Sequence, residues 1–191
     1  MTRPILRTTR LELIPLHDDH LDFEVELDAD PEVLRYLDGR ALTRAEVEQA
    51  HHHRLRAGNK IPGLGFWVGF GAGRFVGFWM LQPPHGPDQR EVPGEADLGY
   101  RLVRRSWRQG LAREGACELL RYGFAEVGLR RIFGQTLAVN GPSRAVMASI
   151  GMTYVRAFPS SSPEPLVAGS KRGEVEYEIT RDQWCEQARM R

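Results

Sequence analysis

The chain has 191 residues, of which 41% are apolar and 27% charged, a composition typical of one ordinary globular domain. Its 26 basic and 25 acidic side chains leave a formal charge of +1, which argues against a wholly basic surface for nucleic acid. The N-terminal segment has no secretory signal pattern, and no uncharged run approaches the ~18 residues of a membrane helix. We therefore expect a cytoplasmic protein of one domain, residues 1–191, with no membrane and no nucleic-acid partner.

Hydrophobic periodicity, caps and turn residues predict a series of strands and helices. Strands are expected at 10–16, twice within 65–81, and at 96–103, 130–139, 152–158 and 174–180. Helices are expected within 17–30, from a new start at Asp30-Pro31, from Thr43 to Gly58, and at 110–127, 140–151 and 181–191. Loops are expected at 82–95 and 159–173. Because helices lie before, within and after one run of strands, the predicted class is α+β.

Two of these elements depend on local signatures. Thr43 and Glu46 have the spacing of a capping box, in which each side chain satisfies a backbone N–H at the start of a helix. The sequence GAGR, residues 71–74, separates two aromatic-rich runs and predicts the turn of a hairpin.

Several common sites are excluded by the residues present. A P-loop needs a lysine directly after glycine, and neither lysine of the chain, Lys60 or Lys171, has that neighbour. The run GFGAGR places its third glycine one residue too early for a dinucleotide fingerprint, and it fits the hairpin better. No Gly-x-Ser-x-Gly elbow is present, so hydrolase chemistry of that kind has no support.

The histidines and cysteines give no metal signature. His51, His52 and His53 are consecutive on a predicted helix and point ~100° apart, so they cannot face one ion, and a solvated helix face is expected. Cys117 and Cys185 form no ligand pair, and Cys117 falls in an apolar helical pattern that suits a small core residue. We predict no metal site.

The turn between the strand at 96–103 and the helix at 110–127 is the strongest candidate for a binding site. Gly110 and the small Ala112 allow a ligand to approach the backbone, and the first turn of a helix offers N–H groups that favour phosphate. The arginines around it add positive charge. On these residues alone, a phosphate site and a plain connection with solvated arginines remain equally open.

Read together, LGYRLVRRSWRQGLAREGACELLRYGF (98–124) and LRRIFGQTLAVNGPSRAVMASIGM (129–152) resemble the GNAT superfamily of acyl-CoA-dependent N-acyltransferases, and most closely its RimJ/RimL-type branch. The resemblance extends to RTTRLELIPL, DADPEVLRYLDG and EVEYEITRDQW, nearly the whole chain. It implies a single-domain GNAT-like fold with a mixed, mostly antiparallel twisted sheet, flanked by helices, whose two central strands splay apart at a bulge. Acetyl-CoA would lie in that opening, and no metal would be required.

The resemblance also implies which residues hold acetyl-CoA. One strand would pair its backbone with the pantetheine arm, the amides of the following turn would surround the pyrophosphate, and an Asn-x-x-Ser motif would lie near the thioester sulfur. The residues implied, in that order, are Leu102, Val103 and Arg104; Arg108, Gln109, Gly110, Leu111, Ala112 and Arg113; and Asn140 and Ser143.

Two positions depart from the commonest family pattern. Trp107 occupies a position that often holds Gln or Arg; the RimJ/RimL-type pattern accepts Trp there, which narrows the branch. Met147 occupies the position at which many members carry a tyrosine that acts as general acid, and a thioether cannot donate a proton. Ser143 is the substitute that we name for this role.

The implied reaction is direct attack of a neutral amine on the acetyl thioester. A general base is expected at the strand bordering the cleft, where Asp97 and Glu95 are the candidates, with His85 as a weaker one. Tyr100 and Trp79 could line the acceptor site, although aromatic residues on strands are more often core. The loops at 82–94 and 159–173 are the expected specificity elements, because loops on a rigid sheet carry recognition.

The acceptor remains open between a protein N-terminal α-amine and the amine of a small molecule. A CoA-binding module that has kept the fold and lost transfer is the alternative to an enzyme, and Met147 leaves room for it. A monomer and a homodimer are equally compatible with the resemblance.

Overall fold

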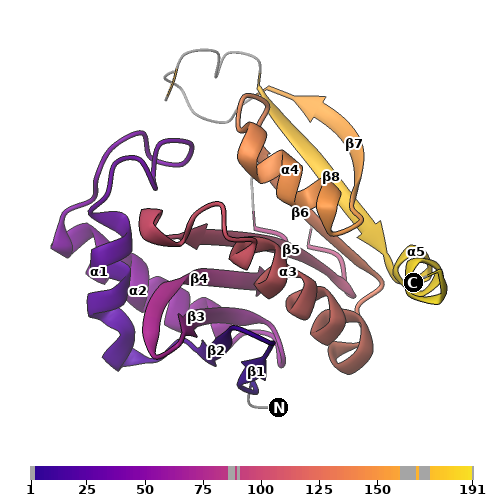
Figure 1. Ribbon diagram of the computed structural model, residues 1–191, viewed down its shortest axis with the longest axis horizontal. Helices are drawn as coiled ribbons and strands as arrows, with labels where there is room; N and C mark the ends of the chain where they lie inside the picture. The colour runs from indigo at the N-terminus through magenta and orange to yellow at the C-terminus, as the bar shows by residue number, and fades with distance from the viewer. Residues whose placement is uncertain (1–2, 86–88, 90, 160–166, 168–172, 191) are drawn as a thin grey trace.

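The computed structural model describes residues 3–85, 89, 91–159, 167 and 173–190. These residues form one eight-stranded sheet with the order β1-β2-β3-β4-β5-β6-β8-β7. Neighbouring strands run antiparallel except for β5 and β6, which are parallel. The observed fold confirms the predicted class: a single-domain α+β fold with a mixed, mostly antiparallel sheet flanked by helices (Figure 1).

The elements have the following bounds. The strands are β1 (Leu6–Arg7), β2 (Glu12–Pro15), β3 (Gly65–Gly71), β4 (Arg74–Gln82), β5 (Glu95–Leu102), β6 (Arg131–Leu137), β7 (Thr153–Phe158) and β8 (Glu174–Thr180). The helices are α1 (Leu21–Asp28), α2 (Arg44–Gly58), α3 (Leu111–Tyr122), α4 (Gly141–Ser149) and α5 (Arg181–Arg189), with short 3-10 turns η1 (Asp18–His20) and η2 (Arg104–Ser106) and a π-helical turn η3 (Gly123–Val127).

The capping box and the hairpin turn predicted from local sequence are both present. Thr43 and Glu46 form the capping box that starts α2. The hairpin turn between β3 and β4 has Ala72 and Gly73 at positive φ, 48° and 73°, the conformation of a two-residue turn that suits the right-handed twist of its strands. The helix predicted at 110–127 is continuous, but its last turn is π-helical.

One expectation for the N-terminal region was wrong, and one element there was not predicted. No regular helix follows Pro31, because the Asp30 side chain accepts from the Glu32 N–H and the chain makes consecutive turns from residue 31 to residue 40. The two-residue strand β1 was not predicted, since a strand this short gives no alternation that can be recognised.

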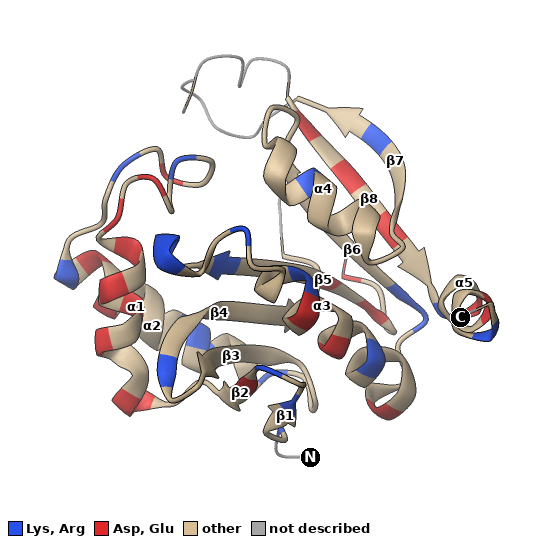
Figure 2. Ribbon diagram, viewed as in Figure 1, with Lys and Arg blue, Asp and Glu red and all other residues tan. Residues whose placement is uncertain are grey.

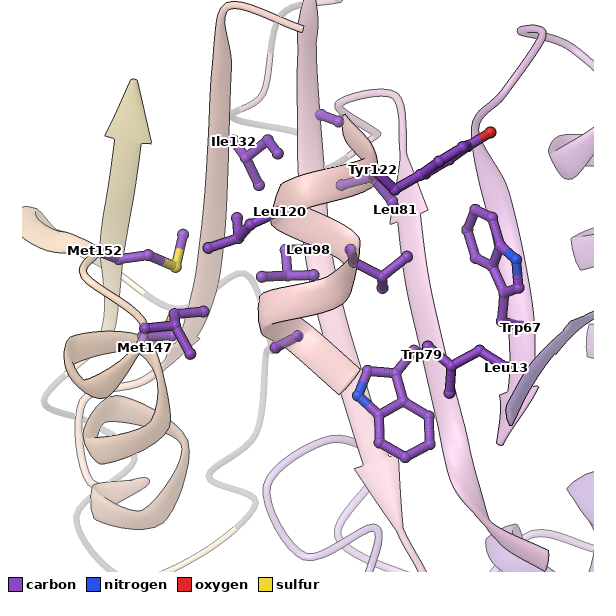
Figure 3. Packing of buried hydrophobic residues seen from close by; sticks show 14 of the residues in the cluster. Leu13, Trp67, Trp79, Leu81, Leu98, Leu120, Tyr122, Ile132, Met147 and Met152 are labelled. Atoms are coloured by element: carbon purple, nitrogen blue, oxygen red, sulfur yellow. The ribbon is translucent and has the colours of Figure 1, made fainter. Parts of the chain in front are cut away.

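Apolar side chains fill both faces of the sheet. The larger cluster lies between the sheet and α3, which crosses in front of β4 and β5 in Figure 1. There Trp79 is fully buried, and a Cβ on Gly115 of α3 would come within 2.5 Å of its ring, so the helix packs tightly on the strand. Figure 3 shows this cluster from Leu13 to Met152. A second cluster, around Phe78, packs against α1 and α2 on the opposite face.

The sheet divides at β5 and β6. β5 pairs with β4 from Asp97 to Leu102, but it pairs with β6 only from Glu95 to Asp97. Beyond Asp97 the two strands separate, and the strands β8 and β7 stand at an angle to β3–β5 in Figure 1. The splayed central strands are therefore present. We call the space between β5 and β6 beyond Asp97 the splay.

The expected bulge is not at the splay. The β4–β5 register runs without a shift, and the register shifts of the described strands fall between Gly69 and Phe70 in β3 and between Tyr154 and Arg156 in β7. β5 and β6 therefore separate where their parallel pairing ends at Asp97, and no extra residue in β5 accompanies the separation.

Candidate active site

The backbone of β5 turns alternately toward β4 and toward the splay. The Val103 N–H donates to the Val76 carbonyl at 3.1 Å, so Val103 faces β4. Because the backbone groups of successive residues in a strand point to opposite sides, those of Leu102 and Tyr100 face the splay. The Leu102 carbonyl, which faces away from β4, accepts from the Trp107 indole N–H at 2.6 Å. Of the expected pantetheine partners, Val103 is thus used within the sheet. The edge that faces the splay consists of the backbone groups of Tyr100 and the N–H of Leu102, since the Leu102 carbonyl is bound by Trp107.

The turn before α3 presents backbone N–H groups. Arg108 and Gly110 both have positive φ, 58° and 76°, and Gly110 is the N-cap of the helix. The first intrahelical bond runs from the Glu114 N–H to the Gly110 carbonyl, so the amides of residues 111–113 precede it. A non-glycine residue such as Arg108 in the left-handed region is strained, and such strain is concentrated at ligand sites.

The side chains around this turn are largely held by protein partners. Arg104 pairs with Asp30 at 2.6 Å, and Arg105 pairs with Glu26 at 2.5 Å. Three further contacts hold the turn: Gln109 Nε2 to Arg105 O at 2.7 Å, Arg10 Nη1 to Gln109 O at 2.9 Å, and Arg113 Nε to Ser149 O at 3.4 Å. The arginines that stand out in the sequence therefore fix the turn, while its amides are what it can offer to a phosphate.

Asn140 and Ser143 lie on the other side of the splay, at the start of α4. Asn140 is the N-cap, its side chain accepting from the Ser143 N–H at 3.3 Å and donating to Thr136 Oγ1 at 2.9 Å. Asparagine is favoured at this position because its side chain satisfies an N–H that the helix leaves unpaired. The cap fixes the first turn of α4, and with it the position of Ser143.

Tyr100 reaches across the splay to this turn. Its hydroxyl donates to the Ser143 carbonyl at 3.1 Å and lies 3.4 Å from Ser143 Oγ. Burial raises the pKa of Tyr100 to about 12, against an opposing effect of the hydrogen bond from Ser143. Tyr100 and Trp79 were expected as core residues or as acceptor lining. Trp79 is core, whereas the Tyr100 hydroxyl contacts Ser143, and no sequence signal predicted this contact.

Met147 is a buried core residue at the start of the splay, beside Gly134 of β6. It is 3% exposed and packs toward β6, where a Cβ on Gly134 would lie 3.2 Å from its sulfur (Figure 3). The position at which a tyrosine would be expected is therefore filled by an apolar side chain that belongs to the core.

The opposite face of β5 carries the carboxylates. Asp97 is 5% exposed, and its Oδ2 lies 3.6 Å from Nδ1 of His85. Burial lowers the pKa of His85, which keeps the imidazole neutral at neutral pH. Glu95 is instead paired with Arg131 at 2.8 Å. The structure brings Asp97 and His85 together and commits Glu95 to an ion pair.

A pocket of 260 Å³ lies on this face, at the side of the splay where β5 and β6 are still paired. Its apolar walls are Pro84, Val92 and Phe133, and its polar lining consists of Gln89, Glu95, Arg131, Arg156 and Glu176. Pro84 and Gln89 come from the loop expected to govern specificity. The other such loop, 159–173, lies almost entirely outside the described residues.

The consecutive histidines are not one solvated face. His51 is 1% exposed and is hydrogen-bonded to Glu24 of α1, whereas His52 and His53 are exposed. Its spacing of four from the buried Val47 is the signal that could have found this, because such residues share a helix face. Among the residues that the structure describes, no group of three His, Cys, Asp or Glu is arranged to hold a metal ion.

Comparison with known proteins places this geometry in a family. The model of the acetyltransferase (GNAT) domain matches residues 10–153. The chain belongs to that family, and it is an acetyltransferase. The FsC-acetyl coenzyme A-N(2)-transacetylase of Aspergillus fumigatus is 42% identical to it over 185 residues, which cover 95% of this chain and 78% of that protein.

Solved structures of this family share the fold. A GNAT-family acetyltransferase from Bacillus anthracis superposes with a TM-score of 0.75 at 21% identity, covering 94% of this chain and 99% of its own. RimL, a ribosomal L7/L12 α-N-protein acetyltransferase solved with coenzyme A, superposes with a TM-score of 0.77 at 16% identity, with 94% and 99% covered. At these identities the likeness shows the fold.

Proposed function

We propose that the chain transfers an acetyl group from acetyl-CoA to an amine nitrogen, and that its acceptor is FsC or a molecule with the same kind of N(2) amine. The observation that carries the proposal is the splay, where β5 and β6 no longer pair, with a carboxylate–imidazole pair on one face of β5 and a pair of hydroxyls on the other. The 42% identity to an acetyl coenzyme A N(2)-transacetylase over nearly the whole chain supports the acceptor.

The residues present fit acetyl-CoA. The backbone groups of Tyr100 and the N–H of Leu102 form a strand edge that faces the splay, with which an amide-bearing pantetheine arm would pair. Residues 108–113 present amides at a helix N-terminus, where the diphosphate would be stabilised by N–H groups and by the helix dipole. Asn140 and Ser143 stand across the splay, close to where the thioester would lie.

The side chains that could accept the proton of the attacking amine lie on the α1–α2 face of β5. A neutral amine is the nucleophile, and after attack its nitrogen must lose one proton. Asp97 is buried beside His85, so either Asp97 accepts the proton directly or His85 accepts it next to the Asp97 carboxylate, in place of its contact with Gln82 Nε2 at 3.1 Å. Glu95 is the less available candidate, because its carboxylate is already paired with Arg131 at 2.8 Å. On the α3–α4 face, the Ser143 hydroxyl is placed to donate a hydrogen bond to the leaving sulfur.

The acceptor would enter from the α1–α2 face, where the 260 Å³ pocket lies. Its size and mixed lining suit one arm of a small molecule that carries the amine, with the charged groups holding polar atoms next to it. A long acidic surface for a polyamine is not part of this pocket, since Arg131 and Arg156 accompany its two glutamates.

We assign this activity to the whole chain, residues 1–191, as a cytoplasmic monomer or homodimer. Trp107 supports a place in the RimJ/RimL-type branch, because its side chain takes part in the turn by binding the Leu102 carbonyl. No helix in the described part of the chain has the length and apolar character needed to cross a membrane.

The test is an acceptor screen with the full chain and acetyl-CoA. FsC, a peptide with a free N-terminus and spermidine are compared by release of free thiol and by mass spectrometry of the product. We expect thiol release with FsC and a product heavier by one acetyl group on N(2). Transfer to the peptide alone would overturn the acceptor. No release with any amine, together with protection from thermal unfolding by CoA, would indicate a module that binds CoA without transfer.

A further inference from the structure

We infer that Tyr100 is a catalytic residue: its phenol hydroxyl protonates the thiolate that leaves when the acetyl group is transferred, and Ser143 orients and assists it. This inference rests on the proposed function. It concerns a residue on β5, opposite the α4 position where Met147 stands.

The first observation is where the hydroxyl lies. β5 and β6 separate after Asp97, and Tyr100 is three residues farther along the open edge of β5. Its side chain leaves β5 on the α3–α4 face and crosses the splay to the first turn of α4, 43 residues away in sequence. A molecule held along the open edge of β5 and bounded by α4 would have to pass this hydroxyl.

The second observation is that the hydroxyl is held in a defined place. It donates to the Ser143 carbonyl at 3.1 Å, and Ser143 Oγ is 3.4 Å away. The Asn140 cap in turn fixes the backbone of Ser143. The ring packs against the larger apolar cluster, so the phenol is preorganised by its ring and by its oxygen.

The third argument is acidity. The sulfur of a leaving thiol becomes a thiolate, with an ordinary pKa near ~8.5 for a cysteine thiol, whereas a phenol has ~10 and an aliphatic hydroxyl is far weaker as an acid. The phenol of Tyr100 is therefore a better proton donor than the Ser143 hydroxyl. Burial raises the pKa of Tyr100 to about 12, which keeps the proton on the phenol throughout the neutral range and also makes it a weaker acid than a free phenol.

Other side chains nearby are placed differently. Met147 has no proton to give and is buried in the core. The Thr136 hydroxyl accepts from Asn140 Nδ2 at 2.9 Å, and the Tyr177 hydroxyl accepts from Arg144 Nε at 3.3 Å. Among these residues, Tyr100 is the one whose phenol hydroxyl contacts Ser143 across the splay.

The proposed step balances as follows. The amine nitrogen forms the new bond to the acetyl carbon, the carbon–sulfur bond breaks, and its electron pair stays on sulfur. Sulfur takes the proton of the Tyr100 hydroxyl, and the amine gives one proton to Asp97 or His85. Solvent then returns a proton to Tyr100, directly or through Ser143, and removes one from the base. No oxidant or further reactant is involved.

The first experiment needs no acceptor and titrates the thiol of bound CoA by its ultraviolet absorbance. Tyr100→Phe removes only the hydroxyl, and Tyr177→Phe is the matched control beside α4. A hydroxyl that donates to the thiolate stabilises its charged form, so we expect the thiol pKa in the Tyr100→Phe complex to lie about one unit or more above that in the wild type and in the control. Equal thiol pKa values in all three complexes would overturn the inference.

The second experiment measures transfer with the acceptor found in the screen. Tyr100→Phe should lower kcat by about 10²-fold or more and leave the CoA dissociation constant within about threefold, and Ser143→Ala should lower kcat less. Full kcat in Tyr100→Phe, with a large loss in Ser143→Ala, would assign the proton to Ser143. If wild type transfers to no amine, the proposed function fails, and the thiol titration still decides the role of Tyr100.

Discussion

Along β5, alternate side chains face α1 and α2 or face α3 and α4, and the two sets differ in kind. Toward α1 and α2 the strand presents Glu95, Asp97 and Arg101; toward α3 and α4 it presents apolar residues and the Tyr100 hydroxyl. Figure 2 shows acidic residues on α1 and along β8. In the proposed mechanism, the strand therefore separates two proton transfers: the charged side accepts the proton of the amine, and the neutral side donates one to the leaving sulfur.

The charged side rests on a buried ionic cluster. Asp28, at the end of α1, is fully buried and lies 2.8 Å from the Arg101 guanidinium and 3.7 Å from that of Arg54. Burial raises the pKa of Asp28, and both arginines oppose that effect. Both guanidinium groups also lie over the Phe78 ring, at 5.3 and 5.4 Å. These contacts attach α1 and α2 to β5 directly beside Tyr100.

The largest expected effect is on the base. Asp97→Asn replaces the carboxylate with a group that cannot accept a proton, and we expect kcat/KM to fall by about 10²- to 10⁴-fold. Glu95→Gln is the control two residues away on the same face, where Arg131 already holds the carboxylate; it should cost less than about tenfold. The reverse order of the two losses would make Glu95 the base.

The buried ionic cluster predicts a loss of stability. Asp28→Ala leaves Arg101 buried without its partner, which should lower the free energy of unfolding by about 3–5 kcal/mol. Chemical denaturation measures the change. The exposed ion pair of Arg7 and Glu12, at 2.6 Å, provides the control, because loss of Glu12 should change stability by less than about 1 kcal/mol. Similar losses in the two variants would show that the cluster does not hold the helices.

The turn before α3 predicts a loss of CoA binding without a matching loss of fold. Gly110→Trp places a large side chain over the amides, and we expect the dissociation constant of CoA to rise at least about 100-fold, as measured by calorimetry. Gly128→Trp is matched at the other end of the helix, since φ is positive at both glycines, 76° and 79°. Each should lose about 1–2 kcal/mol of stability. Retained CoA affinity in Gly110→Trp would contradict the phosphate site.

The smallest effect concerns pH on the α1–α2 face. Burial lowers the pKa of His20 from 6.5 to about 4, with a smaller contribution from His17. Between pH 6.5 and 4, His20 is therefore protonated in the unfolded chain but not in the folded chain. The free energy of unfolding is unaffected by His20 above pH 6.5 and falls as pH decreases from 6.5 toward 4. In His20→Gln the free energy of unfolding should drop less between pH 7.5 and 5 than in the wild type. Parallel curves would refute the assignment.

Much of the fold was predictable because its signals are local. The capping box at Thr43, the hairpin at Ala72 and Gly73, and the alternation in β5 each require only neighbouring residues. The segment after Pro31 was not predictable in this way, since a proline that suits a first helical turn suits an open turn equally well, and the Asp30 side chain decided between them.

The candidate site was predictable in its backbone and less so in its side chains. Gly110 and the Asn140 cap are sequence signals for helix starts, so the amides and the place of Ser143 could be expected. The hydroxyl contact of Tyr100 with Ser143 joins residues 43 apart, and it depends on how far β5 and β6 separate. That separation is a property of the assembled sheet, which local patterns do not encode.

The division between the two faces of β5 is tested most directly by a crystal structure with acetyl-CoA. We expect the thioester sulfur to lie in the splay, within hydrogen-bonding distance of Tyr100 Oη, and the acetyl carbon to be accessible from the face that carries Asp97. A sulfur remote from Tyr100, or an acetyl group closed off from Asp97, would contradict it.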